Sequence, residues 1–528
     1  MANYDAIIIG AGHNGLVAAA YLARAGKKIL LLERRPIIGG IAVTEAIFPG
    51  YKVPSCAHLA GNFSKQIVSD LELHRHGLEV LPLRPLLFAP APDGTALIIP
   101  PEFANTAQEI AKHSKPDADR FQPFCALMKR LSEFLAILYN APLPNRANPG
   151  RPDLAKFLKL GWKFHRLGEK DMHEFLCILP MSIADLLNEW FESDLLKGAL
   201  AGSSMLASFV GPRQQGTAFN LLHHQLGESN GALRTAGFVR GGIGVLTEAL
   251  LAAAKSYGAE ARTNAEVVRI LVAADGVASG VVLKNGEEIR AEHIISSVDV
   301  KRTLFGFLEP TTLDPHFFLQ VKNIRSRGTV AKIHLALDRL PKFSASNAAA
   351  LGGVIHIGPS LDYLERASDD AKYGRFSKRP FLEITIPSVA DPSLAPAGKH
   401  LMSIWMQSAP YELRGSDWHA ESEALGDAVI RTIEEYAPGF ANTILHRQVL
   451  TPLDLEQTYG VTEGHLYHAE MALDQIFFMR PVPGCSGYQT PIEDLYLCGS
   501  GTHPGGGITG LPGYYAAHKI LKNWPRKK

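Results

Sequence analysis

The sequence has few cysteines, almost no net charge and no long hydrophobic run. Its 528 residues include five cysteines and carry a formal net charge of +1. No two cysteines form a CxxC pair, so neither a thiol redox centre nor a disulfide framework is indicated, and a reducing compartment is expected. The balanced charge gives no support for nucleic-acid binding, which usually shows as a basic patch. The cysteines are Cys56, Cys125, Cys177, Cys485 and Cys498.

Membrane-spanning and signal segments are not expected either. No window of about 18 uninterrupted apolar residues occurs. Residues 7–32 are largely apolar, but glycines interrupt them and no basic stretch precedes them, so they do not resemble a signal peptide. We therefore expect a cytoplasmic protein that contacts membranes at most at their surface. At 528 residues the chain is too long for one core, and two or more domains are expected.

The N-terminal stretch contains the most informative motif. The apolar residues 6–9 predict a buried strand, which leads directly into G-A-G-H-N-G at 10–15 and then into a helix rich in alanine and leucine. Gly10 permits a tight turn, Gly12 lets the backbone approach a pyrophosphate, and Gly15 allows the helix to pack closely on the strand. The spacing predicts a dinucleotide site, and a tight turn without a ligand is the alternative.

The residues after this helix extend the same interpretation. A second strand, 29–32, ends at Glu33, whose carboxylate can accept the hydroxyl protons of a ribose. The adjacent Gly39 and Gly40 let the backbone pass close to the phosphates and on toward the reactive ring of a cofactor. Such a glycine pair is common in FAD enzymes and is not expected in dehydrogenases that use only NAD.

A second glycine-rich segment lies near the C-terminus. A predicted strand, 495–498, opens into a loop with five glycines between Gly499 and Gly507, and a helix follows through residues 516–521. Backbone N–H groups at a helix start can face a phosphate or the electron-rich edge of a flavin. Since this loop is far from the first motif in sequence, we expect both ends of the chain to meet around one cofactor.

Four stretches carry a resemblance to a known family. They are I-G-A-G-H-N-G-L-V-A-A-A-Y-L at 9–22, E-R-R-P-I-I-G-G at 33–40, L-D-Q-I-F-F-M-R-P-V-P at 473–483, and L-Y-L-C-G-S-G-T-H-P-G-G-G at 495–507. Together they resemble the phytoene desaturase branch of the FAD-dependent amine oxidase superfamily. The resemblance implies FAD as cofactor and an α/β fold, with a Rossmann-like FAD-binding domain (a parallel sheet) and a discontinuous α+β substrate domain. Many relatives have an arginine directly after the double glycine, where this chain has Ile41.

The same resemblance implies how the domains are divided. We expect an FAD-binding domain made of residues 1–75, 230–310 and 489–528. The substrate domain would comprise residues 76–229 and 311–488. Because ligand sites commonly lie where domains meet, the substrate is expected between the sheet of the second domain and the exposed face of the flavin.

Roles for individual residues follow from the resemblance. Val267 and Ile270 match a V-x-x-I pattern in which the strand presents its backbone to the adenine, although an ordinary hairpin around the turn Asn285-Gly286 would look the same. Ile508 would point its backbone N–H at the flavin ring. The expected cofactor-binding residues are Gly10, Gly12, His13, Asn14, Gly15, Glu33, Arg34, Gly39, Gly40, Ile41, Val267, Gly499, Ser500, Gly507, Ile508 and Thr509.

His503 is the candidate catalytic side chain, since it lies within the loop that is expected to face the flavin. It would polarise the flavin ring or the substrate, and fixing the shape of the loop is its alternative role. His465 and His468 are further candidates for the pocket. No third ligand accompanies their spacing, so no metal site is predicted. No catalytic base stands out.

Residues 154–170 allow two interpretations. Leucine, phenylalanine and tryptophan alternate there with four lysines and one arginine, which is typical of a basic amphipathic helix that lies in a bilayer interface. The alternative is a surface helix of the substrate domain that packs its apolar stripe inward, and Gly161 weakens either helix.

Three functions are compatible with these motifs. The first is a flavin dehydrogenase that transfers hydride from a small lipophilic, polyprenoid-like substrate and forms a C=C or C=N bond. The second is a flavin-dependent amine oxidase, for which a cage of aromatic residues near the flavin is expected. The third is a non-redox protein on this scaffold, either a flavin-bound isomerase or a lipid carrier, and the intact C-terminal glycine loop argues against a carrier that has lost FAD. The dehydrogenase fits best, while the substrate, electron acceptor and oligomeric state stay open.

Overall fold

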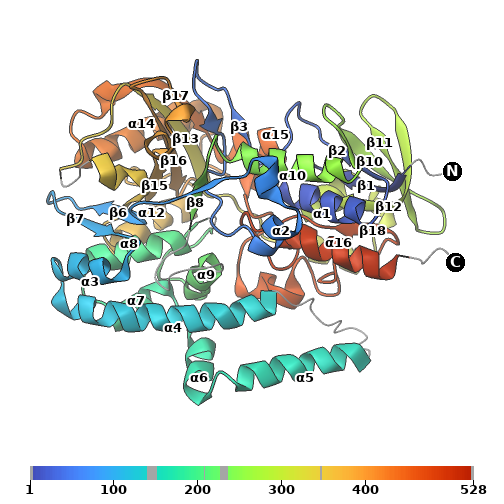
Figure 1. Ribbon diagram of the computed structural model, residues 1–528, viewed down its shortest axis with the longest axis horizontal. Helices are drawn as coiled ribbons and strands as arrows, with labels where there is room; N and C mark the ends of the chain where they lie inside the picture. Colours follow the sequence, from blue (N-terminus) through green and yellow to red (C-terminus); the bar gives the residue numbers. More distant parts are fainter. Residues whose placement is uncertain (1–3, 140–150, 207, 226–235, 345–347, 525–528) are drawn as a thin grey trace.

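The computed structural model describes residues 4–139, 151–206, 208–225, 236–344 and 348–524. In these residues the chain forms two sheets of seven strands each and two small two-stranded sheets. The large sheets lie toward opposite ends of the long axis of the molecule, with helices packed around them (Figure 1). The predicted α/β fold class is confirmed.

The first sheet is built around β1 (Tyr4–Ile9). It pairs in parallel with β2 (Ile29–Leu32) on one side and with β12 (Glu288–Ser296) on the other. Outside these, β9 (Glu260–Arg262) pairs with β2 and β18 (Leu495–Leu497) pairs with β12, again in parallel. This confirms the predicted Rossmann-like sheet. It also places the C-terminal strand only one strand away from the N-terminal one.

Alternate residues of β1 point to opposite faces of this sheet, as the pleat of a strand requires. Ala6 and Ile8 belong to an apolar core that also contains the buried faces of α1 (His13–Arg24), α10 (Gly244–Ser256) and α16 (Leu511–Asn523). These three helices lie together on one side of the sheet in Figure 1. They bring the first turn of α1 close to the loop that precedes α16.

The opposite face of the first sheet packs on the predicted hairpin. Ile7 and Ile9 contact a core that includes residues of β10 (Val267–Val272), β11 (Ala278–Leu283) and α11 (Pro315–Lys322). The hairpin continues into β12, so the antiparallel strands extend directly from the parallel sheet.

The second sheet has the strand order β17–β13–β16–β15–β14–β6–β7 and is antiparallel except between β14 and β6. Ile333 and Ile404 on one face pack against α14 (Trp418–Tyr436). Trp405 and Val330 on the other face join the core of the helical layer. The strands are β6 (Leu87–Pro90), β7 (Ala96–Ile99), β13 (Val330–Leu337), β14 (Val354–Ile357), β15 (Leu382–Thr385), β16 (His400–Gln407) and β17 (Ile444–Leu450).

The helical layer lies between β7 and β8 in the sequence. Its long helix α4 spans the layer, and α5 is its outermost helix, followed along the chain by α6 (Figure 1). No helix in the described ranges combines the length and apolarity that a membrane crossing needs. The layer consists of α3 (Phe103–Ala111), α4 (Lys115–Tyr139), α5 (Arg151–His165), α6 (Glu169–Ile178), α7 (Ile183–Trp190), α8 (Asp194–Ser204) and α9 (Thr217–His224).

Shorter elements connect these parts. The small sheets are β3 with β4 and β5 with β8. The connecting elements are β3 (Thr44–Glu45), β4 (Val53–Pro54), α2 (Lys65–Asp70), β5 (Val80–Pro82), β8 (Gly237–Val239), α12 (Leu361–Lys372), α13 (Pro387–Ala390) and α15 (Pro452–Tyr459).

Candidate active site

The turn between β1 and α1 has the geometry that its glycines suggest. Gly10 has a φ of +86°, and a Cβ there would lie 2.7 Å from the Ser297 hydroxyl. A Cβ on Gly15 would lie 2.3 Å from the carbonyl oxygen of Gly10, so the helix could not pack as closely. Gly12 differs, because a Cβ there would meet no atom within 4 Å. Two of the glycines are therefore required by packing, and the third faces open space.

That open space belongs to a cavity of about 610 Å³, which we call the cofactor cavity. It lies at the carboxyl ends of the parallel strands β1, β2 and β12, where open α/β sheets bind their ligands. The lining residues are Gly10, Gly12, His13, Asn14, Glu33, Arg35, Gly40, Ile41, Ser297, Val298, Asp299, Tyr459, Gly460, Val461, His468 and Ser500.

The polar groups of the cofactor cavity fit a dinucleotide. Four buried atoms in its lining have no hydrogen-bond partner among the described residues: His13 Nε2, Asn14 Oδ1, Arg35 Nη1 and His468 Nδ1. The Glu33 carboxylate accepts the backbone N–H groups of Ala11 and Arg35, both at 3.0 Å, which leaves it lone pairs for ribose hydroxyls. Phosphates and hydroxyls of FAD would supply the missing partners.

Two histidines in this cavity are held in the neutral form. Burial lowers the pKa of His13 to about 4, and the neighbouring His468 acts in the same direction. Burial also lowers the pKa of His468 to about 4, with the Arg480 charge adding to the effect. At neutral pH both imidazoles can therefore donate one hydrogen bond and accept another.

A second cavity, of about 560 Å³, lies between the C-terminal glycine loop and the second sheet, and we call it the substrate cavity. Ile41 lines both cavities, so the two spaces meet at this residue. The wall is largely apolar and aromatic. The lining residues are Ile41, Ala57, His58, Leu59, Gly61, Asn62, His223, His224, Trp405, Leu466, Tyr467, Gly507 and Ile508.

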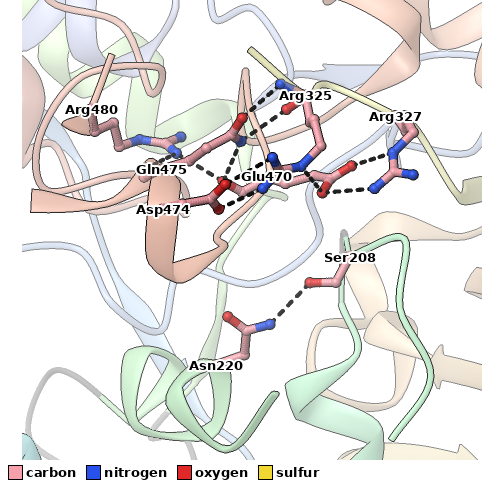
Figure 2. A network of polar contacts seen from close by, with 8 residues as sticks. All are labelled: Ser208, Asn220, Arg325, Arg327, Glu470, Asp474, Gln475 and Arg480. Carbon is pink, nitrogen blue, oxygen red and sulfur yellow. Dashed lines mark hydrogen bonds and ion pairs between the residues drawn. The ribbon is translucent and has the colours of Figure 1, made fainter. Parts of the chain in front are cut away.

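Arg480 fixes the C-terminal loop against the chain that precedes it. Its guanidinium is 1% exposed, and it donates to the carbonyl oxygens of Ser500 and Tyr467 at 2.8 Å. Further bonds reach the carbonyls of Ala469, Glu470 and Gln475. Figure 2 shows Arg480 beside a surface network in which Arg325 and Arg327 pair with Glu470. At the other side of the loop, Asn14 Nδ2 donates to Ser500 Oγ at 3.2 Å.

The structure brings many of the predicted residues together. Gly507, Ile508 and Ile41 line the substrate cavity. Gly15 lies beneath the turn, and Gly39 donates its N–H to the Ala11 carbonyl. The predicted residues that line the cofactor cavity are Gly10, Gly12, His13, Asn14, Glu33, Gly40, Ile41 and Ser500.

Several predicted residues lie elsewhere. Arg34 does not line the cofactor cavity: its guanidinium donates to the carbonyls of Gln457 and Thr458, whereas the neighbouring Arg35 lines the cavity. Val267, Gly499 and Thr509 are not part of either cavity lining, and the Val267 side chain packs into the core beneath the hairpin.

His503, the predicted catalytic side chain, also lies outside both cavity linings. It is fully buried. Its ring packs edge-on to Tyr139, with 5.8 Å between the ring centroids, and its carbonyl accepts the Tyr488 hydroxyl at 3.1 Å. Burial lowers the pKa of its imidazole to about 3. These contacts fit the alternative role, in which His503 fixes the shape of the glycine loop.

Other lining residues had no role in the sequence interpretation. Ser297, Val298 and Asp299 directly follow β12, and their position at the end of a parallel strand is a signal that could have found them. His58, Trp405 and the pair His223 and His224 come from segments distant in sequence, for which no local pattern exists.

A glycine turn at one cavity, and a second cavity that meets the first at Ile41 and is lined by the C-terminal glycine loop, are the arrangement expected of a flavin-dependent oxidoreductase. Comparison with protein families agrees. Residues 8–71 match an NAD(P)-binding Rossmann-like domain, and residues 185–513 match the flavin containing amine oxidoreductases. The chain belongs to the flavin containing amine oxidoreductase family, and FAD is its cofactor.

Relatives of known name confirm the predicted resemblance. The rat pyridine nucleotide-disulfide oxidoreductase domain-containing protein 2 is 37% identical, with 98% of this chain and 94% of the relative covered. One of the limonene dehydrogenase proteins of Castellaniella defragrans is 28% identical over 98% and 94% of the two chains. The neurosporene-forming phytoene desaturase of Rhodobacter capsulatus is 25% identical over 96% and 92%.

A solved structure shows the same fold at low identity. Wild-type putrescine oxidase bound to putrescine aligns with a TM-score of 0.61 and 14% identity over 98% of each chain. At this identity the likeness concerns the fold alone.

Proposed function

We propose that this flavoenzyme is a dehydrogenase of a lipophilic, hydrocarbon-like substrate. The observation that carries the proposal is the wall of the substrate cavity. Among its described lining residues none is an aspartate, glutamate, lysine or arginine, and most are apolar or aromatic. Limonene and phytoene, the compounds in the names of two relatives, are both hydrocarbons. Such a wall binds an apolar molecule by removing its surface from water.

Residues of the cofactor cavity would bind FAD, and residues of the substrate cavity would bind the substrate. The backbone at Gly12 and the start of α1 would hold the phosphates of FAD, and Glu33 would hold a ribose. Ile41 stands where the cavities meet, so the reactive part of the cofactor and the substrate would face each other there. When bound, FAD supplies the capacity to accept a hydride. The rings of Trp405 and Tyr467 in the cavity wall would exclude water from this region.

The flavin absorption spectrum tests this proposal. Purified holoprotein is kept anaerobic while a membrane lipid extract, limonene or a simple primary amine is added. We expect the extract or the hydrocarbon to bleach the oxidised-flavin bands and the amine to leave them unchanged. Bleaching by the amine alone would reject the proposal in favour of amine oxidation, and bound flavin that no lipid bleaches would favour an isomerase.

Amine oxidation is the second candidate, because one observation favours it. Trp405 and Tyr467 both line the substrate cavity, and two aromatic side chains at the flavin are what an amine site would show. The same spectra compare the two functions directly. Replacing Tyr467 with phenylalanine keeps the ring, so it separates the need for an aromatic surface from the need for a hydroxyl.

We further propose that α5 contacts an anionic membrane surface, from which a lipophilic substrate could enter. Leu158 and Trp162 are 67% and 56% exposed and lie one helical turn apart. Arg166 lies a further turn along, with its guanidinium 4.8 Å above the Trp162 ring. Phe157 and Phe164 instead contact other aromatic rings of the protein. The outward face therefore joins apolar and basic groups, as interfacial helices do.

Flotation with liposomes tests this contact. The double variant Leu158→Ala/Trp162→Ala should bind vesicles that contain anionic lipid at least about tenfold more weakly, since it loses buried apolar surface. Leu319→Ala is the matched control, because Leu319 is 54% exposed on α11 and should leave binding unchanged. Equal flotation of all three proteins, or none with the wild type, would contradict the proposal.

A further inference from the structure

A row of polar and charged side chains crosses the inner face of the second sheet. Trp405 on β16 is directly opposite Lys332 on β13 and Glu383 on β15. Glu383 in turn is opposite His356 on β14. Residues in register on neighbouring strands point to the same face. Lys332 and Glu383 therefore stand on either side of the Trp405 ring, which lines the substrate cavity.

His58 bridges the two charged members of this row. Its ring lies over Trp405, with 4.8 Å between the ring centroids. Its Nδ1 is 2.6 Å from Lys332 Nζ, and its Nε2 is 3.3 Å from Glu383 Oε1. The other oxygen of Glu383 lies 3.4 Å from Nε2 of His356, whose Nδ1 is 3.0 Å from the Ala199 carbonyl oxygen. Of these groups His58 and Trp405 form the cavity wall.

Stability alone does not account for these charges. Lys332 and Glu383 are 0% and 1% exposed, and moving such groups out of water costs more than their attraction usually returns. Apolar side chains of similar size would hold the sheet equally well. A buried amine and carboxylate joined through an imidazole, directly behind the wall of a reaction cavity, are instead arranged for proton transfer.

We propose that His58, Lys332 and Glu383 form a proton relay that takes up the proton lost by the substrate during dehydrogenation. The inference rests on the proposed function and adds the proton acceptor to it. Dehydrogenation of two adjacent carbons breaks two C–H bonds and forms one C=C bond. Oxidised FAD, when bound, would supply the acceptor for one hydrogen as a hydride, and the relay would take the other hydrogen as a proton.

The proton would enter at His58 and end on Lys332. The substrate proton binds at Nε2, where the Glu383 carboxylate 3.3 Å away stabilises the added positive charge. The proton on Nδ1 then passes to the neutral amine of Lys332, and the imidazole is left in its other neutral tautomer. His58 thus binds one proton at Nε2 and releases one from Nδ1. The Lys332 ammonium ion and the Glu383 carboxylate are then an ion pair on opposite sides of the His58 ring.

The amine of Lys332 is suited to this task at neutral pH. Burial lowers its pKa to about 7, against a smaller opposite effect of Cys56 and Glu383. A substantial fraction of the amine is thus neutral and able to accept a proton. The other titratable groups that face this cluster are Cys56, His334 on β13, His356 on β14, and His223 and His224 on α9.

Two of these neighbours, Cys56 and His334, do not replace Lys332 as the proton acceptor. Burial raises the pKa of the Cys56 thiol to about 12, so it stays protonated. Burial keeps the pKa of His334 well below its usual value, and its Nε2 already bonds the Ser55 carbonyl at 3.0 Å.

The rate of anaerobic flavin reduction should therefore depend on pH. Only the neutral amine can accept the proton, so the rate should rise as pH increases through about 7 and level off above it. Lys332→Arg keeps the positive charge but cannot lose its proton, and it should lack this rise and react at least about 100-fold more slowly. Glu383→Gln removes the anion that stabilises the ammonium form, and the rise should move to lower pH.

A measurement without substrate separates the relay from the proposed function. Full-length protein labelled with 13C at its lysines is titrated by NMR. One lysine should titrate near pH 7, and its signal should disappear in Lys332→Arg but persist in Lys399→Arg, a control at a partly exposed ion pair with Asp338. If every lysine titrates near its usual pKa of about 10.4, the relay is wrong even if hydrocarbons bleach the flavin.

Two further combinations of the NMR titration with the flavin-reduction results also test the relay. A lysine that titrates near pH 7 in wild type but not in Lys332→Arg supports the relay even if the true substrate is not a hydrocarbon, because any dehydrogenation releases a proton. If that lysine is found and the reduction rate nevertheless shows no dependence on its ionisation, the relay is rejected.

Discussion

Replacing Arg480 with methionine is expected to abolish flavin binding and to lower the free energy of unfolding by about 3–5 kcal/mol. The guanidinium is buried and bonds five backbone carbonyls on both sides of the cofactor region. Methionine fills part of the volume but donates no hydrogen bond. Each buried carbonyl left without a donor costs about 1–3 kcal/mol, less where water can enter.

The loss of fixed structure should be largest around the cofactor, because Arg480 bonds one residue of each cavity lining. It bonds Ser500, which lines the cofactor cavity, and Tyr467, which lines the substrate cavity. Without it the glycine loop loses its fixed position relative to residues 467–475. Lysine at this position keeps the charge but has three donors on one nitrogen, so Arg480→Lys should bind flavin weakly and fall between methionine and wild type.

The absorbance ratio at the flavin and protein bands, together with thermal unfolding, measures both effects. Arg327→Met is the control within the same network (Figure 2). The Arg327 side chain is 45% exposed, and Glu470 would still pair with Arg325 after the change. Arg327→Met should therefore lower the free energy of unfolding by no more than about 1 kcal/mol, and the protein should retain the flavin. A full flavin content in Arg480→Met would contradict this prediction, because it would show that the glycine loop keeps its shape without the Arg480 hydrogen bonds.

The parts of the site that could be predicted from the sequence are formed by contiguous residues. Gly10, Gly12 and Gly15 act within one turn, and Glu33 is placed by the short strand before it. Their spacing within one strand-turn-helix unit is what predicts a dinucleotide site. The meeting of both chain ends was predictable from the second glycine-rich loop, and β1 and β18 do both pair with β12.

The rest depends on side-chain direction and on contacts between distant segments. Arg34 and Arg35 are adjacent, yet their guanidinium groups reach different places: Arg34 donates to the Thr458 carbonyl, whereas Arg35 lines the cofactor cavity. His503 lies in the glycine loop, but its ring turns toward α4 and away from both cavities. Arg480 belongs to a recognised motif, whereas its carbonyl partners become visible only in the folded chain.

Replacing Gly12 with aspartate is expected to abolish FAD binding while leaving the folded protein intact. A Cβ at this position meets no atom within 4 Å, and the backbone has an ordinary extended conformation with φ −71° and ψ 170°. Gly12 is the N-cap of α1, where aspartate is among the preferred residues, so the apoprotein should keep its stability or gain roughly a few tenths of a kcal/mol. The new carboxylate would occupy the space for the phosphates.

Charge repulsion there should be large. Two like charges about 4 Å apart near a protein surface repel by about 4 kcal/mol, which corresponds to roughly a thousandfold loss of affinity. Gly12→Asn is the matched control, because it has the same shape without the charge and should lose affinity through size alone. Isothermal titration of the apoproteins with FAD gives the affinities, and thermal unfolding gives the stabilities.

Equal affinities for the two variants would mean that the phosphates do not lie at this turn. An unfolded Gly12→Asp protein would mean that the turn needs glycine for its own structure, as Gly15 does.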